Sequence, residues 1–187
     1  MNASQKTALL ELARSAIEST FTGDEQSLIA QMRRLKGGLY EQQRGCFVTL
    51  RDVNDALRGC IGNLIGRGNV AQSVVALARE AAFSDHRFVA LKPRELDHLI
   101  IEISLLTPLE PIDDYRLIEI GRDGVILTCG NRRAVFLPQV ATEQGWDLST
   151  MLTHLSMKAG LAPKAYTEAE CRFEVFQAEV FSDDDHL

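Results

Sequence analysis

The chain has 187 residues, of which 45% are hydrophobic and 25% charged, and its formal net charge is −6. This is the composition of an ordinary globular protein, and the acidic balance argues against binding nucleic acid through a broad basic face. No apolar run approaches the roughly 18 residues of a membrane span, and no basic segment followed by an apolar one opens the chain, so we expect neither a membrane segment nor a secretory signal.

A chain of this length fits a single domain over residues 1–187, with room for one small appended lobe. The four cysteines, Cys46, Cys60, Cys129 and Cys171, are scattered and form no Cys-x-x-Cys pair. Their spacing opposes a zinc ribbon and provides no disulfide framework. Together with the missing secretory signal, it predicts a reducing, cytoplasmic location.

The N-terminal half is predicted to begin with helices and to continue into a β-hairpin. Apolar residues at helical spacing predict an amphipathic helix over Ser4–Thr20, and a second, short helix is expected over Ser27–Leu35. Aromatic and β-branched residues predict a strand over Cys46–Arg51, and the polar turn after it lets Ala56–Ile61 return as the partner strand. The clearest helix, with an asparagine as its N-cap, covers Asn69–Phe83.

The C-terminal half is predicted to add further strands and one more helix. Alternating apolar residues predict a strand over Leu99–Leu106, and a Gly-Asn turn joins Val125–Cys129 to Arg133–Leu137 as a second hairpin. A capped helix is expected over Asp147–Ala159, and a single last strand over Arg172–Phe181.

Hairpins interspersed with helices predict an α+β fold whose sheet is largely antiparallel and flanked by helices. The chain has no internal repeat and no low-complexity linker. The acidic tail at residues 182–187 is expected to be frayed.

The most unusual stretch is the second arm of the first hairpin, Leu57-Arg58-Gly59-Cys60-Ile61-Gly62. Gly59 and Gly62 allow the backbone to come close to another group, which leaves the thiol between them accessible. In a regular strand Arg58 shares a face with Cys60, and a cation that close favours the thiolate. The start of the helix at residue 69 is expected to border the same cleft and to favour an anion there. The structural alternative is a buried thiol beside glycines that mark a bulge.

The chemistry of this stretch stays open between catalysis and binding. Cys60 is the candidate nucleophile, but such a cysteine normally has an oriented histidine within reach, and no histidine of the sequence is an evident partner. Asp85 and Arg87, from the loop Ser84–Phe88, are candidate binding residues, and so is Gln139. No metal site is expected, because the chain lacks helical zinc-site histidines. It also lacks a Gly-rich phosphate loop, and which cofactor it uses, if any, is unknown from the sequence.

Several blocks of the sequence resemble the AMMECR domain family, whose bacterial and archaeal members are known as AmmeMemoRadiSam system protein A. They follow the family's order over about nine-tenths of the chain, and they read FVTL, LRGCIG, AAFSDHRF, IEISLLTP, LPQVA, GWD and KAGL. The chain departs from the family pattern at His86, Ala134 and Ser156, where Pro, Gly and Cys are usual. His86 is therefore discounted as a shared catalytic base.

The resemblance implies an α+β fold with an antiparallel sheet, and association with a Memo-type protein and a radical-SAM enzyme. It supplies no established reaction. We therefore expect a component of a Memo-type and radical-SAM associated system, with a small pocket for an anion or metabolite around Leu57–Gly62 and Cys60 chemistry as its enzymatic form. The alternative is a non-catalytic interaction or scaffold module for partner enzymes.

Overall fold

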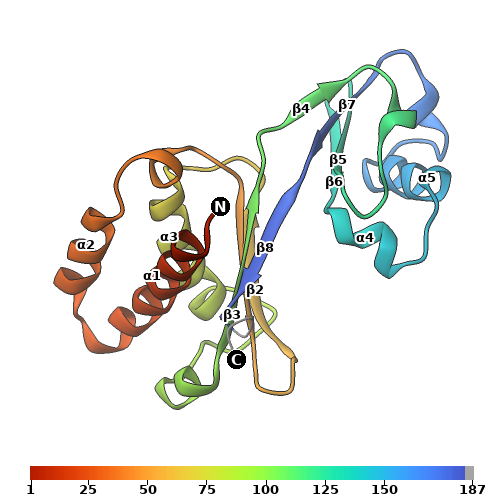
Figure 1. Ribbon diagram of the computed structural model, residues 1–187. Helices are drawn as coiled ribbons and strands as arrows, with labels where there is room; N and C mark the ends of the chain where they lie inside the picture. Colours follow the sequence, from red (N-terminus) through yellow and green to blue (C-terminus); the bar gives the residue numbers. More distant parts are fainter. Residues whose placement is uncertain (184–187) are drawn as a thin grey trace. The chain divides into compact units, whose positions relative to one another are not determined.

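The computed structural model describes residues 1–183 and divides the chain into two compact units (Figure 1). The first unit comprises Met1–Leu106 and the residues that return to it from Glu179 onward, and the second comprises Thr107–Ala178. Each unit has its own four-stranded sheet and its own hydrophobic core. The expectation of a single domain over residues 1–187 stays a prediction.

The first unit packs helices against one face of its sheet (Figure 1). Its strands stand in the order β2-β1-β3-β8, and β1 is antiparallel to both β2 and β3. The strands are β1 (Cys46–Arg51), β2 (Leu57–Asn63), β3 (Ile100–Leu106) and β8 (Ala178–Ser182). The helices are α1 (Ala3–Thr22), α2 (Glu25–Arg34) and α3 (Val70–Phe83), with 3-10 turns η1 (Gly38–Glu41) and η2 (Pro93–His98). α1 and α3 contact the strands, and α2 contacts α1.

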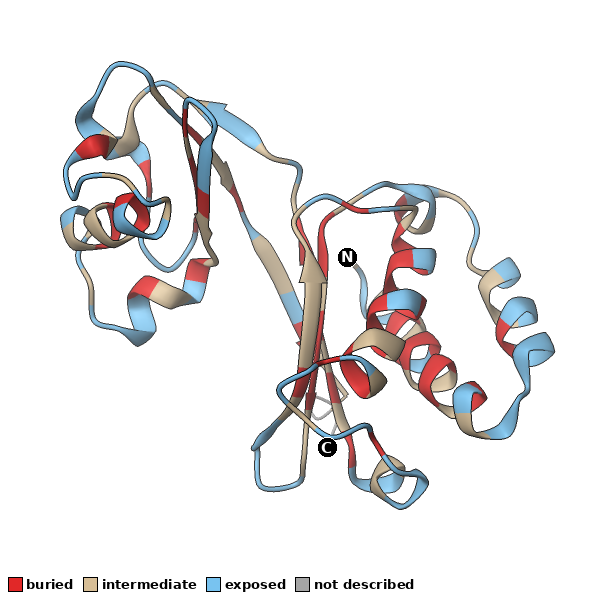
Figure 2. Cartoon of the chain, turned by 180° about the vertical axis from the view of Figure 1, so that it is seen from behind, coloured by how far each residue is buried: buried red, intermediate tan, exposed pale blue. Residues whose placement is uncertain are grey.

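Helices α1 and α3 begin with the same local device, a capping box. An asparagine side chain, from Asn2 or Asn69, accepts the backbone N–H three residues later, and the glutamine at that position accepts the asparagine N–H in return. Both helices bury an apolar stripe, whereas α2 buries only Leu28. Figure 2 shows this difference as buried residues along α1 and α3 and a mostly exposed α2.

The second unit forms a sheet of order β4-β7-β5-β6 with two helices of its own. The strands are β4 (Glu110–Ile112), β5 (Gly124–Cys129), β6 (Arg132–Phe136) and β7 (Cys171–Phe176). The helices are α4 (Pro138–Glu143) and α5 (Leu148–Lys158), with 3-10 turns η3 (Tyr115–Leu117) and η4 (Ala165–Thr167). Leu127 and Phe173 of the sheet share a core with Leu152 and Leu155 of α5.

The α+β class with antiparallel sheets is confirmed, and both expected hairpins form, as β1–β2 and β5–β6. The single strand expected over Arg172–Phe181 is wrong, because it is divided into β7 and β8 of two different sheets. The division falls at Gln177, whose carbonyl oxygen accepts the Thr107 N–H at 2.8 Å and whose N–H donates to Thr107 Oγ1 at 2.8 Å.

The end of the chain is ordered as far as it is described. Ser182 ends β8, and the Asp183 carboxylate accepts a hydrogen bond from the Ile101 N–H at 2.8 Å. The rest of the tail that was expected to fray, residues 184–187, lies outside the described residues. Across residues 1–183, no helix is both long enough and apolar enough to cross a membrane.

Candidate functional site

Cys60 lies in β2, the outer strand of the first sheet, directly opposite Thr49 of β1. The neighbouring Gly59 faces α3, so Cys60 faces the other side of the sheet. Its side chain is partly exposed, and the Thr49 hydroxyl donates to Sγ at 3.3 Å. The structure therefore gives the thiol a polar neighbour and partial access, in contrast to the fully buried Cys46.

An ion pair from the loop after α3 holds the backbone of Cys60. The Asp85 carboxylate accepts the Cys60 N–H at 2.9 Å, and the Arg87 guanidinium donates to the Cys60 carbonyl oxygen at 2.9 Å. The same guanidinium donates to both Asp85 oxygens, at 2.9 and 2.7 Å. Only 1% of the Asp85 side chain is exposed, against 49% for Arg87. The two side chains thus take the place of a neighbouring strand at the sheet edge.

The hydrogen bonds of this pair keep the Asp85 carboxyl ionised. The Arg87 guanidinium holds the pKa of the Asp85 carboxyl well below its usual range, although burial of the carboxyl acts in the opposite direction. Arg87 Nη1 makes no hydrogen bond within residues 1–183, so one edge of the exposed guanidinium is available beside Cys60.

Arg58 does not reach Cys60 as a regular strand would require. The pairing of β1 with β2 shifts between Leu50 and Arg51, and this irregularity leaves Arg58 without a cross-strand partner. Such a bulge redirects the side chain. The Arg58 guanidinium bonds the Glu95 carboxylate at 2.7 and 3.4 Å and the Val89 carbonyl oxygen at 2.7 Å. The cation beside Cys60 is consequently Arg87.

The two glycines of the stretch both stand where the backbone is closely approached. A Cβ at Gly59 would lie 2.2 Å from the Ala81 carbonyl oxygen of α3, and one at Gly62 would lie 2.1 Å from the Phe47 ring. Neither glycine has a positive φ. Close approach, rather than backbone conformation, is therefore what these positions require.

The start of α3 borders a separate cavity of about 380 Å³. Asn63, Arg67 and Gly68 line it together with Gln72 and Ser73 of the helix, and its lining includes neither Arg58 nor Cys60. The expectation of one cleft shared by Arg58, the glycine stretch and this helix start is therefore wrong. The bulge at Arg58 and the position of Cys60 on the face away from α3 are the physical reasons.

Gln139 lies in α4 of the second unit, where it is exposed. Its proposed part in the Cys60 site has no described contact to support it. His154 of α5 stacks on Trp146 with ring centroids 4.2 Å apart, and no histidine within residues 1–183 is hydrogen-bonded to Cys60. Sequence reasoning missed Thr49, Glu95 and Phe47, because their contacts with the stretch depend on strand register and on a distant 3-10 turn.

The remaining two cysteines are joined, which corrects the expectation that the chain provides no disulfide. Cys129 and Cys171 form a disulfide across 42 residues of sequence, with Cα atoms 4.3 Å apart. They are opposite each other in β5 and β7, a register that linear spacing does not reveal. Among the described residues, the group whose atoms could hold a metal ion lies at this place and comprises Cys129, Glu168 and Glu170.

Comparisons with known proteins agree with this architecture. Residues 10–181 match the family model AMMECR1. A protein of Methanothermobacter thermautotrophicus is 40% identical over 185 residues, which cover 94% of this chain and 93% of that protein. A protein of Pyrococcus horikoshii is 37% identical over 186 residues, covering 94% and 88%. The crystal structure of an uncharacterised Pyrococcus horikoshii protein matches with a TM-score of 0.80 at 33% identity, covering 98% of this chain and 94% of that chain.

Replacing Gly59 by Ala is expected to destabilise the protein by about 1–3 kcal/mol, because the new methyl group would press against backbone atoms of α3. Gly62→Ala is the comparison variant. Its methyl group meets the ring of Phe47, a partly exposed side chain rather than backbone, so the loss should be smaller. Urea denaturation of both variants measures the difference, and a Gly62→Ala variant that is the less stable of the two would contradict the assignment.

Asp85→Asn is expected to lower the free energy of unfolding by about 1–3 kcal/mol near neutral pH, because the charged partner of Arg87 and of the Cys60 N–H is lost. The pKa of Asp85 is lower in the folded than in the unfolded chain. Its contribution is therefore present above the unfolded value of about 3.9 and is lost as the pH falls below it. The difference between wild type and variant, measured by urea denaturation, should shrink near about pH 3.

Asp114 and Arg116 supply a matched control, since they form the same Asp-x-Arg ion pair at the surface, with the Arg116 side chain 76% exposed. Asp114→Asn should change stability little, because exposed ion pairs contribute little. Two outcomes would count against the role assigned to Asp85. One is an equal loss of unfolding free energy in Asp85→Asn and Asp114→Asn. The other is a stability difference between wild type and Asp85→Asn that does not change with pH.

Proposed function

This chain belongs to the AMMECR1 family, and from that premise we propose that its first unit is a binding module centred on Cys60. The module takes a small metabolite that carries a carboxylate or phosphate group. We further propose, from the family resemblance, that the protein works in the cytoplasm with a Memo-type protein and a radical-SAM enzyme.

The observation that supports a binding site is the fixed position of Cys60. Its N–H and carbonyl oxygen are both held by the Asp85–Arg87 pair, while its thiol stays partly exposed beside the Thr49 hydroxyl. A site whose groups are already held in place loses little conformational entropy when a ligand binds. The partly exposed thiol and the free edge of Arg87 then offer a ligand two polar contacts, and the buried Thr49 hydroxyl supports the thiol through its hydrogen bond.

The charge at this place favours recognition through directed hydrogen bonds rather than through a net positive field. Arg87 is paired with Asp85, and Arg58 is paired with Glu95, so both candidate cations are neutralised by a neighbouring carboxylate. The unbonded Nη1 of Arg87 still carries N–H donors, and a carboxylate or phosphate oxygen is the acceptor that suits a guanidinium best. The ligand is therefore expected to be small and to present an oxygen anion at one end.

Binding is favoured over thiol catalysis by the surroundings of Cys60. A cysteine nucleophile is usually activated by a histidine that a third group orients. The described hydrogen-bond partner of Sγ is the Thr49 hydroxyl, which is no general base near neutral pH. We therefore propose Cys60 as a ligand contact.

Inorganic phosphate is the probe for this proposal. Titrated against 15N-labelled protein, it should shift the backbone amides of residues 58–62 and 85–88 and the Arg87 side-chain Nε signal. Prior alkylation of Cys60 with iodoacetamide should block these shifts. Cys46 should stay unmodified, since it is fully buried and burial raises its pKa to about 12.

Cys60→Ser tests whether binding requires a thiolate at this position, and Arg116→Gln is the surface control, because Arg116 is a highly exposed arginine paired with a nearby aspartate. The serine variant should keep the phosphate shifts, since it keeps a small polar group at the site. Arg116→Gln should leave them unchanged. Shifts centred on residues 114–116, or none in residues 58–62 and 85–88, would refute the binding site.

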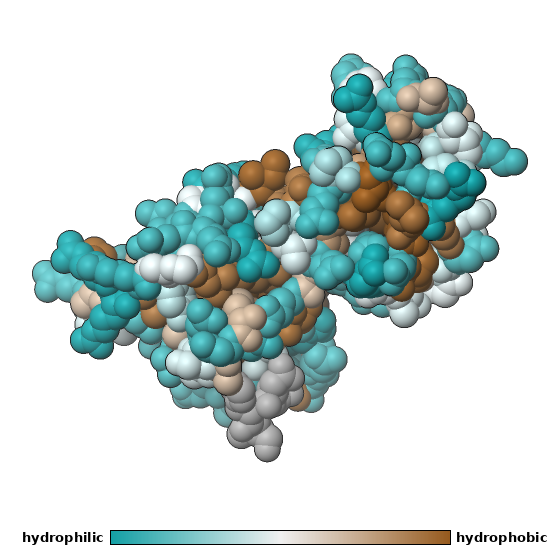
Figure 3. Space-filling model, turned by 45° about the horizontal axis from the view of Figure 1, so that its top comes forward, coloured by the Kyte–Doolittle hydropathy of each residue, from teal (hydrophilic) through white to brown (hydrophobic). Residues whose placement is uncertain are grey.

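A scaffold function is the second candidate, and exposed apolar side chains beside the stretch favour it. Val89 is 76% exposed and Leu57 is 38% exposed, and Arg58 bonds the Val89 carbonyl oxygen. Hydrophobic patches among hydrophilic residues are visible on the face drawn in Figure 3. An apolar surface next to a fixed backbone is suited to contact a partner protein.

Val89→Asp separates this candidate from the metabolite site. If Val89 contacts a partner, the variant should bind a purified Memo-type protein at least about tenfold more weakly, a loss of about 1.4 kcal/mol, with the phosphate shifts retained. Ile29→Asp is the control, since Ile29 lies in α2 and is 45% exposed. Equal partner binding by Val89→Asp and wild type, measured by calorimetry, would exclude the scaffold contact at this surface.

A further inference from the structure

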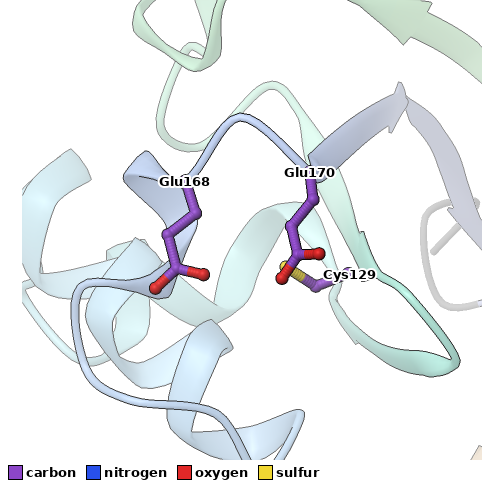
Figure 4. Close-up of side chains that lie close together, drawn as sticks. All are labelled: Cys129, Glu168 and Glu170. Atoms are coloured by element: carbon purple, nitrogen blue, oxygen red, sulfur yellow. The ribbon is translucent and has the colours of Figure 1, made fainter.

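The disulfide of the second unit stands next to two glutamates. Cys129 ends β5 and Cys171 begins β7, and the two residues face each other in the antiparallel pairing of these strands. Glu168 and Glu170 precede Cys171 in the chain. One ligand atom from each glutamate lies within 4.8 Å of the other and of Cys129 Sγ. In Figure 4 the Glu170 carboxylate lies beside the Cys129 sulfur, and Glu168 extends from the preceding turn.

A hydrogen-bonded turn holds the two glutamates in this position. The Glu168 N–H donates to the Ala165 carbonyl oxygen at 2.9 Å, and the Cys171 N–H donates to the Glu168 carbonyl oxygen at 3.0 Å. The turn therefore connects η4 directly to the first residue of β7. It brings the two carboxylates and the Cys129 sulfur together at one end of the β5–β7 pair, and the disulfide joins the Cys171 sulfur to this group.

The two glutamates give the group a negative charge that has no described partner. Both glutamates are exposed, and neither forms an ion pair or side-chain hydrogen bond with any residue from 1 to 183. Two carboxylates that close repel each other, and a divalent ion between them removes the repulsion. Glu168 and Cys171 also line a cavity of about 510 Å³, together with Tyr115 and Tyr166, which gives an ion or a water ligand access to the sulfur.

We propose that the reduced second unit binds one divalent zinc ion through the thiolates of Cys129 and Cys171 and the carboxylates of Glu168 and Glu170. The disulfide closes this site. A dithiol reductant opens it: the S–S bond breaks, the reductant closes its own disulfide, and its two electrons and two protons leave two protein thiols. Each thiol then releases its proton to water as its sulfur bonds the metal.

The donor set selects the kind of ion. Thiolates are soft ligands that favour zinc over magnesium or calcium, and two sulfur and two oxygen donors suit a tetrahedral site. The sulfurs must move apart once the S–S bond is broken, because bonds of about 2.3 Å to a shared zinc hold two sulfurs well beyond bonding distance of each other. Cα atoms 4.3 Å apart on neighbouring strands let side-chain rotation provide this movement.

This site is independent of the ligand proposed at Cys60, since all four donors belong to the second unit. It makes the protein's metal content dependent on redox state. Zinc, once bound, protects both thiols from reoxidation, because the sulfur electron pairs are engaged with the metal. The oxidised protein, in contrast, retains only the two carboxylates as donors.

Cobalt(II) is the probe, because it replaces zinc and gives a thiolate-to-metal charge-transfer band. The full-length protein is reduced with dithiothreitol, freed of it by anaerobic gel filtration, and titrated with cobalt. We expect one equivalent to bind with the charge-transfer band, zinc to abolish the band, and the oxidised protein to show none. A reduced protein without the band would overturn the proposal.

Variants assign the ligands. Glu168→Gln and Glu170→Gln should each weaken cobalt binding at least about tenfold, and Cys171→Ser should reduce the charge-transfer intensity and the affinity together. Glu143→Gln, at an exposed position at the end of α4, is the matched control and should bind as wild type. A band that survives unchanged in Cys171→Ser, or that disappears in Glu143→Gln, would overturn the assignment.

Reduction removes a covalent link from the second unit and lowers its stability. The melting temperature of the reduced protein is therefore a second measure of zinc binding. Zinc should then raise the melting temperature of reduced wild-type protein and leave that of the oxidised protein unchanged. The Glu168→Gln/Glu170→Gln double variant, which keeps both cysteines, should lose most of this increase. An equal increase for the oxidised protein or for the double variant would refute the site.

Discussion

The outer edge of β2 imposes the constraint on which the Cys60 site depends. An edge strand leaves alternate N–H and carbonyl groups without a partner strand. At Cys60 this need is met by side chains, since Asp85 accepts the N–H and Arg87 donates to the carbonyl oxygen. Because both side chains belong to the loop after α3, the exit of the helix and the position of the strand are fixed by one set of contacts. The thiol is held in place without a contact to its sulfur from either charge.

Within the stretch Leu57–Gly62, some residues have structural roles and Cys60 is left accessible. Gly59 allows α3 to approach, and the bulge turns Arg58 toward Glu95. These are the structural roles that glycine and a bulge usually have in strands. Between the two glycines, Ile61 packs against the core, and Cys60 faces away from α3. The structural role that the sequence allowed for this stretch thus belongs to Gly59 and Arg58, whereas the proposed binding role belongs to Cys60.

The elements that depend on a local residue pattern can be predicted from the sequence. The features that depend on pairing between residues far apart in the chain cannot. Helices α1, α3 and α5 and both hairpins follow from apolar periodicity, caps and turn residues, and all are present. The break between β7 and β8 could not be predicted, because apolar and polar residues alternate through it and the residue hydrogen-bonded to Gln177 at the break, Thr107, is far away in sequence. The bulge at Arg58 has no local signature either, since it appears only when β1 is placed opposite β2.

The cysteines show most clearly why composition and spacing could not settle the chemistry. Cys46 is enclosed in the core, and burial raises its pKa to about 12, so its thiol is inert. Cys60 has Thr49 opposite, and its sulfur stays free with a hydroxyl donor. Cys129 has Cys171 opposite, and the two sulfurs are bonded. All of these cysteines lie in strands and differ in burial and in their cross-strand neighbour. The register of the two sheets, rather than the residues adjacent in sequence, therefore determines which sulfur is inert, which is available to a ligand and which responds to reduction.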